Sequence, residues 1–327
     1  MARMTMTLLV ALTAGWCAST VGVAHVHDEQ GVRAAAAPRP TTMSHARVGR
    51  PAAARVARAS AGCPQTNAFL GLPYLNRYAN GNCGYYIGGT VLSTGSLLFP
   101  SHAMTLYQEG PVSIAPKAAF TLASGSTLIM RGGSELYVNG TLVVQPGVTF
   151  RVGGGSITVI GTGASLRMQG TPSHPIVLTG ATATAGPGSW GRIEFDPGAT
   201  GTLSYVHLSY AGATRNYSRS GSATAHTGIV INGAAAVTII DSIIDHSSGH
   251  DVEAAGGARP ALHHDQFLAA RPGNFGVVND AGATGAPLDA TNNYWGAPNG
   301  PRDPAHNPAG AGTRVSAGVT YRPWLTR

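Results

Sequence analysis

The sequence predicts an all-β protein whose chain winds as a parallel β-helix, with three short strands in each coil of about 23 residues. Glycine accounts for 45 of the 327 residues, and no long stretch has helical periodicity. Short apolar segments recur through the second half of the chain with one shared spacing. This repeat runs into the motif Asn292-Asn293-Tyr294-Trp295-Gly296. Together these features favour many short strands joined by tight turns.

Three series of apolar residues, each treated as one strand position in successive coils, share nearly the same spacing. The series are Ile193, Ile229, Val252 and Val277; Leu203, Ile239, Leu262 and Leu288; and Leu208, Ile244 and Phe267. The spacings are 36, 23 and 25 residues in the first, 36, 23 and 26 in the second, and 36 and 23 in the third. A β-sandwich with irregular strands is the alternative, but it does not explain why separate strands share one spacing. Alternate residues of each strand should point inward and outward.

The repeat extends in a weaker form into the earlier half, where residues 136–140 recur 21 residues later as 157–161. A polar set, Tyr205, Asp241 and His264, occupies the same place in three successive coils. We predict that it lies at a turn between the second and third strands, where side chains can satisfy backbone groups. A Tyr-Asp-His relay is the functional alternative.

Residues 1–24 are predicted to be a signal peptide, with Arg3 before an apolar stretch that is too short to favour a membrane span. Residues 25–61 are rich in Ala, Pro and Arg and read as a disordered linker. The formal charge of +7 belongs largely to this linker, because residues 62–327 hold 14 basic and 12 acidic side chains. The charge therefore gives no argument for a nucleic-acid partner.

Two cysteines, Cys63 and Cys83, remain after removal of the predicted signal peptide. In an exported protein such a pair is expected to form a disulfide, worth about 3 kcal/mol for a loop of this length. We expect it to staple an N-terminal cap over residues 62–90. Free thiols or a catalytic cysteine are the alternatives.

Four segments resemble motifs of secreted bacterial right-handed parallel β-helix proteins of the pectin-lyase-like superfamily. Residues 175–179 are similar to a Pro-Ile-x-Phe-Thr segment. Residues 188–195 are similar to a Gly-Asp-Trp-Gly-Gly-Ile-x-Phe segment, residues 289–296 to an Asn-Trp-Trp-Gly element, and residues 319–325 to a terminal Val-x-Tyr-x-Pro-Trp-Leu. The resemblance implies a right-handed β-helix over residues 91–300 and a C-terminal cap over 301–327. The family includes polysaccharide lyases, glycoside hydrolases and surface proteins. The ligand and arginine motifs of pectate lyases and the paired-Asp motifs of polygalacturonases are not found in this sequence.

The strand register predicts one candidate site on the first strand of each coil. Glu194 and Glu253 fall two coils apart, roughly 9–10 Å by strand spacing, which suits the acid and base of an inverting glycosidase. Asp196 lies at the end of the same strand as Glu194. The candidate substrate-binding residues on this face, and in the 13-residue insertion that should overhang it, are Arg192, Arg215, Tyr217, Arg219, His226 and Asp251. The alternative is that these polar residues only keep an exposed strand soluble.

The segment from Asp245 to Asp251 contains His246 and His250 and has ligand types that could hold a metal, together with His263 and His264. No standard zinc spacing is present, and calcium would need more clustered carboxylates. A hydrophilic turn is the preferred interpretation, so neither a metal nor a cofactor is predicted.

The sequence therefore predicts a secreted or cell-surface, monomeric protein that interacts with an extracellular polysaccharide, or serves as a structural element, without catalysis. We expect no nucleic-acid partner and no transmembrane segment. The alternative function is a polysaccharide-cleaving hydrolase or lyase that uses Glu194 and Glu253.

Overall fold

The computed structural model describes residues 74–77, 83–92, 96–99, 104–213, 226–268, 273–282 and 285–327. All of them belong to one compact unit, residues 50–327. The described residues form β-strands and turns with no α-helix, so none of them makes a helix that could cross a membrane. The predicted signal peptide, the linker and Cys63 lie outside the described residues, whereas Cys83 begins β2, so the predicted Cys63–Cys83 disulfide stays a prediction.

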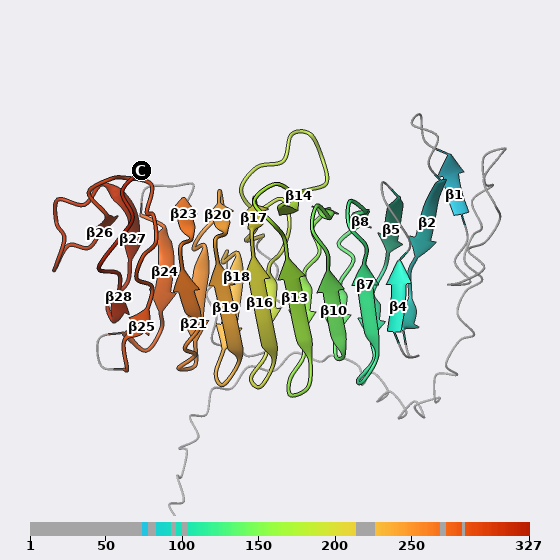
Figure 1. Ribbon diagram of the computed structural model, residues 1–327, viewed down its shortest axis with the longest axis horizontal. Helices are drawn as coiled ribbons and strands as arrows, with labels where there is room; N and C mark the ends of the chain where they lie inside the picture. The colour runs from blue at the N-terminus through green and yellow to red at the C-terminus, as the bar shows by residue number, and fades with distance from the viewer. Residues whose placement is uncertain are drawn as a thin grey trace, which may run out of the picture. The chain divides into compact units, whose positions relative to one another are not determined.

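Three long sheets contain nearly all the strands (Figure 1). The first sheet comprises β3 (Thr90–Leu92), β6 (Val112–Ile114), β9 (Leu136–Val138), β12 (Ile157–Val159), β15 (Ile193–Phe195), β18 (Ile229–Asn232), β21 (Val252–Ala255), β24 (Phe275–Asn279), β27 (Gly312–Val315) and β26 (Pro301–Arg302). The second sheet comprises β4 (Ser96–Phe99), β7 (Ala119–Leu122), β10 (Thr141–Val144), β13 (Ser165–Gln169), β16 (Thr200–Ser204), β19 (Ala236–Ile240) and β22 (Ala261–His263).

The third sheet comprises β1 (Tyr74–Arg77), β2 (Cys83–Ile87), β5 (Thr105–Glu109), β8 (Thr127–Arg131), β11 (Thr149–Val152), β14 (Ile176–Gly180), β17 (Val206–Ser209), β20 (Ile243–Asp245) and β23 (Gln266–Leu268). A small fourth sheet pairs β25 (Leu288–Asp289) with β28 (Val319–Thr320). From β3 to β23, consecutive strands belong to the first, second and third sheets in a repeating order, and we call each such set of three strands one pass of the chain. All the pairs are parallel except β1 with β2. This arrangement is consistent with a parallel β-helix.

The strand pairing confirms the predicted register at most positions. Ile229 pairs with Ile193 on one side and with Val252 on the other, and Val252 pairs in turn with Val277. The same holds for the series through Ile239 and the series through Ile244. These residues are buried in the hydrophobic core, as the alternation of each strand requires. The weaker repeat is confirmed as well, because β9 pairs with β12 along residues 136–138 and 157–159.

The prediction for Leu288 is wrong in one respect. Leu288 is buried in the core, but its strand β25 pairs with β28 and does not extend the second sheet beyond Leu262. The Leu288 amide donates to the Gly318 carbonyl at 2.8 Å. The C-terminal segment supplies a different neighbour at this point, and spacing along the chain carries no information about that neighbour.

The polar ladder is confirmed at the turn between the second and third sheets. Tyr205, Asp241 and His264 each follow a strand of the second sheet and have φ of 50°, 53° and 60°. Asn292 continues the set with φ of 58°. A single residue in the left-handed region redirects the chain sharply, and polar side chains tolerate that conformation better than branched apolar ones.

A second, buried ladder follows directly after these turn residues. The Ser242 hydroxyl accepts the amide of Val206 at 3.1 Å, Asp265 Oδ1 accepts the amide of Ser242 at 2.8 Å, and Asn293 Oδ1 accepts the amide of Asp265 at 2.7 Å. Each side chain thus satisfies a backbone donor one pass earlier in the chain. Buried amides without such partners would cost free energy.

The C-terminal segment lies against the end of this arrangement. The Asn292 amide donates to the Pro323 carbonyl at 2.6 Å, and the Leu325 amide donates to the Asn293 carbonyl at 2.9 Å. Trp295 is buried and its ring centroid lies 5.1 Å from that of Phe267. A side chain at Gly300 would meet the Trp324 ring at 2.6 Å, so glycine is required for this approach.

Asp265 provides a test of the buried ladder. Burial raises the pKa of its carboxyl well above the usual value of 3.8, although the amides of Ser242 and His263 oppose the shift. Asp265 Oδ2 is buried without a hydrogen-bond partner. A carboxyl whose pKa folding raises favours the folded state below its unfolded pKa, and that contribution is lost as the pH rises.

We therefore expect Asp265→Asn to raise the free energy of unfolding at pH 7 by about 1 kcal/mol or more, with a smaller difference near pH 4. An asparagine fits here because Asn293, the equivalent residue one pass later, donates its Nδ2 to the Leu262 carbonyl at 2.8 Å. The matched control, Asn293→Asp, should be destabilising at pH 7. Urea unfolding of both variants at the two pH values is the measurement, and a less stable Asp265→Asn protein at pH 7 would contradict this account.

Candidate functional site

The two predicted catalytic glutamates stand where the register places them. Glu194 on β15 and Glu253 on β21 both pair with Val230, so they lie two strands apart on the first sheet. Both alternate with core residues such as Ile193 and Val252 and therefore point away from the core.

The expectation that this face is exposed is wrong for these side chains. Glu194 and Glu253 are only 1% and 2% exposed. Val230 and Ala255, which share the face and lie outside the core cluster, are fully buried as well. Strand alternation predicts which side chains point away from the core, but it does not predict whether other parts of the chain cover that outer face.

Hydrogen bonds hold both carboxylates in place. The Asn232 amide group donates to Glu194 Oε1 at 3.4 Å and to the Phe195 carbonyl at 3.1 Å. The Thr227 hydroxyl donates to Glu253 Oε2 at 2.9 Å. Asp196 follows β15 and is partly buried. These contacts suit fixed structural carboxylates, and a catalytic role for them stays a prediction.

The described residues that were predicted to bind substrate on this face are buried or partly buried. Arg192 and Asp251 are buried, and neither the Arg192 Nη1 atom nor the Asp251 carboxylate has a hydrogen-bond partner of normal geometry. Burial raises the pKa of Asp251 well above its usual value, and nearby Ser247 only partly offsets this effect. His226 is partly buried beside Ser248. The remaining predicted residues, Arg215, Tyr217 and Arg219, lie outside the described residues.

The histidine segment forms a small carboxylate–imidazole cluster on the third sheet. Asp245 Oδ2 lies 3.0 Å from His207 Nε2, and Asp245 Oδ1 lies 3.3 Å from His246 Nδ1. Tyr210 packs against the His246 ring. Among the described residues, no three His, Cys, Asp or Glu side chains are grouped so that they could hold a metal ion.

A groove that the sequence did not reveal crosses the outer face of the second sheet. It has a volume of about 590 Å³ and spans β13, β16, β19 and β22, three of which stand side by side at the centre of Figure 1. Its lining residues are Ser165, Arg167, Gln169, Thr200, Gly201, Thr202, Ala236, Val237, Thr238, Arg259 and Ala261. We call this feature the second-sheet groove.

The strand register organises the groove into rows. Arg167, Thr202, Thr238 and Ala261 are consecutive partners across the four strands. Arg167 and Arg259 are exposed and come from opposite ends of the groove, β13 and the turn before β22. The lining that the structure describes contains hydroxyl, amide and guanidinium groups and no carboxylate.

Sequence reasoning missed this groove for a physical reason. Threonine is common on any exposed strand, so Thr200, Thr202 and Thr238 carry no distinctive signal on their own. The useful sign would have been their equivalence in register, combined with arginines at both ends. That combination becomes visible only when the outward-pointing residues of the second strand series are aligned, in addition to the inward-pointing apolar residues.

In comparisons with known proteins, no family model, no curated protein and no solved structure matches this chain.

The contact between Asp245 and His207 leads to a testable prediction. The hydrogen bond that His207 donates to Asp245 raises the pKa of His207, and partial burial opposes the shift. A histidine with a raised pKa stabilises the folded state below its unfolded pKa near 6.5, and the effect is lost as pH rises through the folded pKa.

Asp245→Asn should therefore lower the His207 pKa and destabilise the protein more at pH 6 than at pH 8, by less than about 1 kcal/mol because the imidazole is partly exposed. Proton NMR titration of His207 and urea unfolding at both pH values are the measurements. The control is Asp289→Asn, which alters a carboxylate 3.7 Å from His263 instead. An unchanged His207 titration in Asp245→Asn would refute the pairing.

Proposed function

We propose that this protein is an exported right-handed parallel β-helix that binds an extracellular polysaccharide along the second-sheet groove without cleaving it. The observation that carries the proposal is the lining of this groove, where exposed hydroxyls lie in register between two arginines. The polysaccharide class favoured by this lining is an acidic one.

Hydroxyl side chains both donate and accept hydrogen bonds, as the hydroxyls of a saccharide do. Neighbouring strands repeat every 4.7–4.9 Å, so Thr202 and Thr238 present similar groups at successive steps along the groove. Gly201, which precedes Thr202 on β16, is in register with core residues, and a side chain there would meet the buried Phe195 ring at 2.5 Å. A repeating polymer suits such a repeating surface better than a compact small molecule does.

The charges of the groove favour an anionic polymer. Arg167 and Arg259 are exposed at its two ends, and the described lining has no carboxylate to neutralise them. Guanidinium groups bind carboxylates through paired N–H donors. Glycosidic cleavage, in contrast, ordinarily uses two carboxylates placed on either side of the bond.

Cleavage at Glu194 and Glu253 is the second candidate function. Their two-strand separation on the first sheet is the observation that favours it. Their burial argues against access by a polymer. Binding in the groove and cleavage at the glutamates make different predictions for the same assay.

The proposal also includes the coil length of about 23 residues, the terminal caps, export by the predicted signal peptide, a monomeric state and a kinship with the pectin-lyase-like superfamily. The parallel sheets and their fixed order of visits support the architecture. The motifs at residues 188–195, 289–296 and 319–325 support the kinship.

The test uses the full chain with a panel of acidic and neutral polysaccharides. Retention on each polymer is scored together with new reducing ends and unsaturated, ultraviolet-absorbing products. We expect retention on an acidic polymer without product. Arg167→Ala should weaken it about tenfold or more, since a hydrogen bond to a charged group is worth about 1.5–3 kcal/mol.

The matched control is Arg151→Ala, which removes an exposed arginine from β11 on the third sheet, outside the groove. It should leave retention unchanged. Product that disappears in a Glu194→Gln variant would replace the proposal with the enzymatic function. Retention on no polymer, or equal losses in the two arginine variants, would refute binding in this groove.

A further inference from the structure

A second pocket lies at the C-terminal end of the described chain, apart from the second-sheet groove. It has a volume of about 730 Å³ and is bounded by β24, β27, β28 and the turn at residues 303–306. Its lining is mainly apolar and includes Phe275, Pro287, Pro304, Ala317, Val319 and Tyr321. The charged lining residues are Asp303, Arg314 and Arg322, with His306 beside them. We call it the C-terminal pocket.

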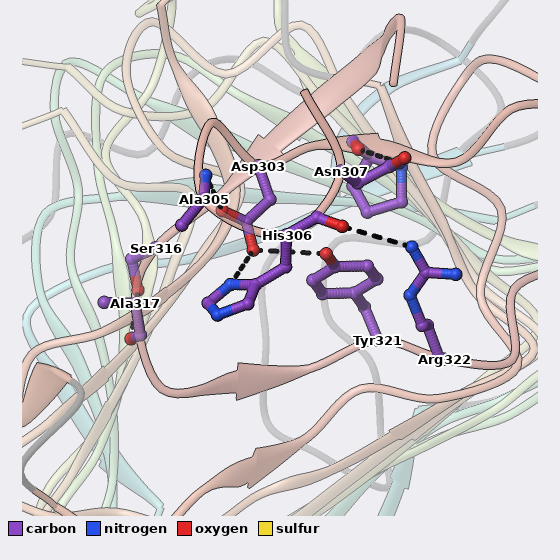
Figure 2. Close-up of polar contacts among 9 residues, drawn as sticks. Asp303, Ala305, His306, Asn307, Ser316, Ala317, Tyr321 and Arg322 are labelled. Carbon is purple, nitrogen blue, oxygen red and sulfur yellow. Dashed lines mark hydrogen bonds and ion pairs between the residues drawn. The ribbon is translucent and has the colours of Figure 1, made fainter. Parts of the chain in front are cut away.

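Both carboxylate oxygens of Asp303 already accept hydrogen bonds from neighbouring groups of the protein (Figure 2). Its Oδ1 accepts the Ala305 amide at 2.9 Å, and its Oδ2 accepts His306 Nδ1 at 3.0 Å and the Tyr321 hydroxyl at 3.1 Å. Burial alone would raise the pKa of Asp303, but these donors outweigh it and hold the pKa below its usual value. The carboxylate therefore stays charged, and its hydrogen bonds link the turn at residues 303–306 to Tyr321, which follows β28.

The two arginines are held differently. The Arg314 Cζ atom lies 4.6 Å from the centre of the Phe275 ring, and the Arg322 Cζ atom lies 4.6 Å from the centre of the Trp324 ring. Arg314 donates to the Gly273 carbonyl at 3.4 Å, and Arg322 donates to the His306 carbonyl at 3.3 Å. Stacking engages the flat face of a guanidinium and leaves N–H groups at its edge available as donors, although the Arg314 Nε atom is buried without a hydrogen-bond partner.

Neither arginine forms an ion pair with a carboxylate among the described residues. Each guanidinium has five N–H donors, and the hydrogen bonds above use only some of them. The pocket thus combines an apolar surface with two cationic groups that have donors to spare. The single acidic lining residue, Asp303, has its acceptors filled by the protein itself.

We propose that the C-terminal pocket binds a ring-bearing carboxylate, a planar or cyclic apolar body with one anionic group. The ring would pack on the apolar lining around Val319 and Tyr321, and the carboxylate would accept hydrogen bonds from Arg314 or Arg322. This site goes beyond polysaccharide binding in the second-sheet groove and does not depend on it.

A purely structural role for the cluster explains only part of the geometry. A role in holding the C-terminal segment in place accounts for the hydrogen bonds that Asp303 accepts from His306 and Tyr321. It does not account for two arginines facing one pocket without carboxylate partners. Two cationic groups that line one pocket attract an anionic ligand by charge complementarity.

The test uses the full chain and three small probes. Benzoate has both the ring and the carboxylate, benzyl alcohol has the ring without the charge, and acetate has the charge without the ring. Binding is measured by calorimetry and by tryptophan fluorescence. Of the four tryptophans, Trp190 and Trp295 are fully buried, Trp16 belongs to the predicted signal peptide, and Trp324 is partly exposed beside Arg322. A fluorescence change that disappears in Trp324→Phe therefore reports on this pocket.

We expect saturable binding of benzoate, with benzyl alcohol and acetate each at least about tenfold weaker. Arg314→Gln and Arg322→Gln should each weaken benzoate binding about tenfold or more, and Arg314→Lys should restore part of it. Arg302→Gln is the matched control, because Arg302 is exposed on β26 and does not line the pocket. Trp324→Phe should abolish the fluorescence change while calorimetric binding persists.

Melting temperatures of all variants show whether a loss of binding comes from unfolding, and any variant that melts early is replaced by its lysine counterpart. The proposal is overturned by the absence of saturable benzoate binding, by equal affinity for benzyl alcohol, or by equal affinities in Arg302→Gln and the two pocket variants. Retention of polysaccharide is scored separately with Arg167→Ala, so failure at one site is distinguishable from failure at the other.

Discussion

Most strands in the three long sheets depend on hydrogen bonds to the strand one pass earlier and to the strand one pass later along the chain. This pairing brings together residues such as Ile193 and Ile229, which are 36 positions apart, and Ile229 and Val252, which are 23 apart. It places the apolar members of each series on top of one another in a single core. A slip of one residue would turn these side chains to the outer face, so the register is strongly determined. Insertions are tolerated only between strands, where they leave the pairing intact.

The turns depend on the same stacking. Tyr205, Asp241, His264 and Asn292 all adopt the left-handed region because each must redirect the chain at the same place in its pass. The buried side chains that follow, Ser242, Asp265 and Asn293, then satisfy backbone amides of the preceding pass. Asp265 is the least favourable member of this ladder, because burial disfavours its charged carboxylate. One pass later, the neutral amide oxygen of Asn293 accepts the equivalent backbone hydrogen bond. Polar groups inside this core are therefore part of the strand-to-strand connection.

The outer faces differ from one another although the backbone repeats. The outward glutamates of the first sheet are buried, whereas the outward hydroxyls and arginines of the second sheet remain accessible. The C-terminal pocket arises where the repeat ends and β28 pairs with β25. Recognition is thus proposed at two places: a regular surface suited to a repeating polymer, and an irregular end suited to a compact anionic ring. The repeat supplies rigidity, and departures from it supply the individual sites.

The sequence by itself determined the all-β class, the register of all but one strand position tested, and the place of the polar turn residues, because apolar spacing reports directly on strand pairing. The left-handed conformation of those turn residues came from the structure. It also placed Glu194 and Glu253 two strands apart. Only the tertiary structure decided that both are buried, that Leu288 pairs with the tail strand, and that Arg167 and Arg259 belong to one groove. The same is true of Arg314 and Arg322, which lie on different segments of the chain. Burial of an outward face and convergence of distant arginines depend on packing between segments, and no local period in the sequence encodes them.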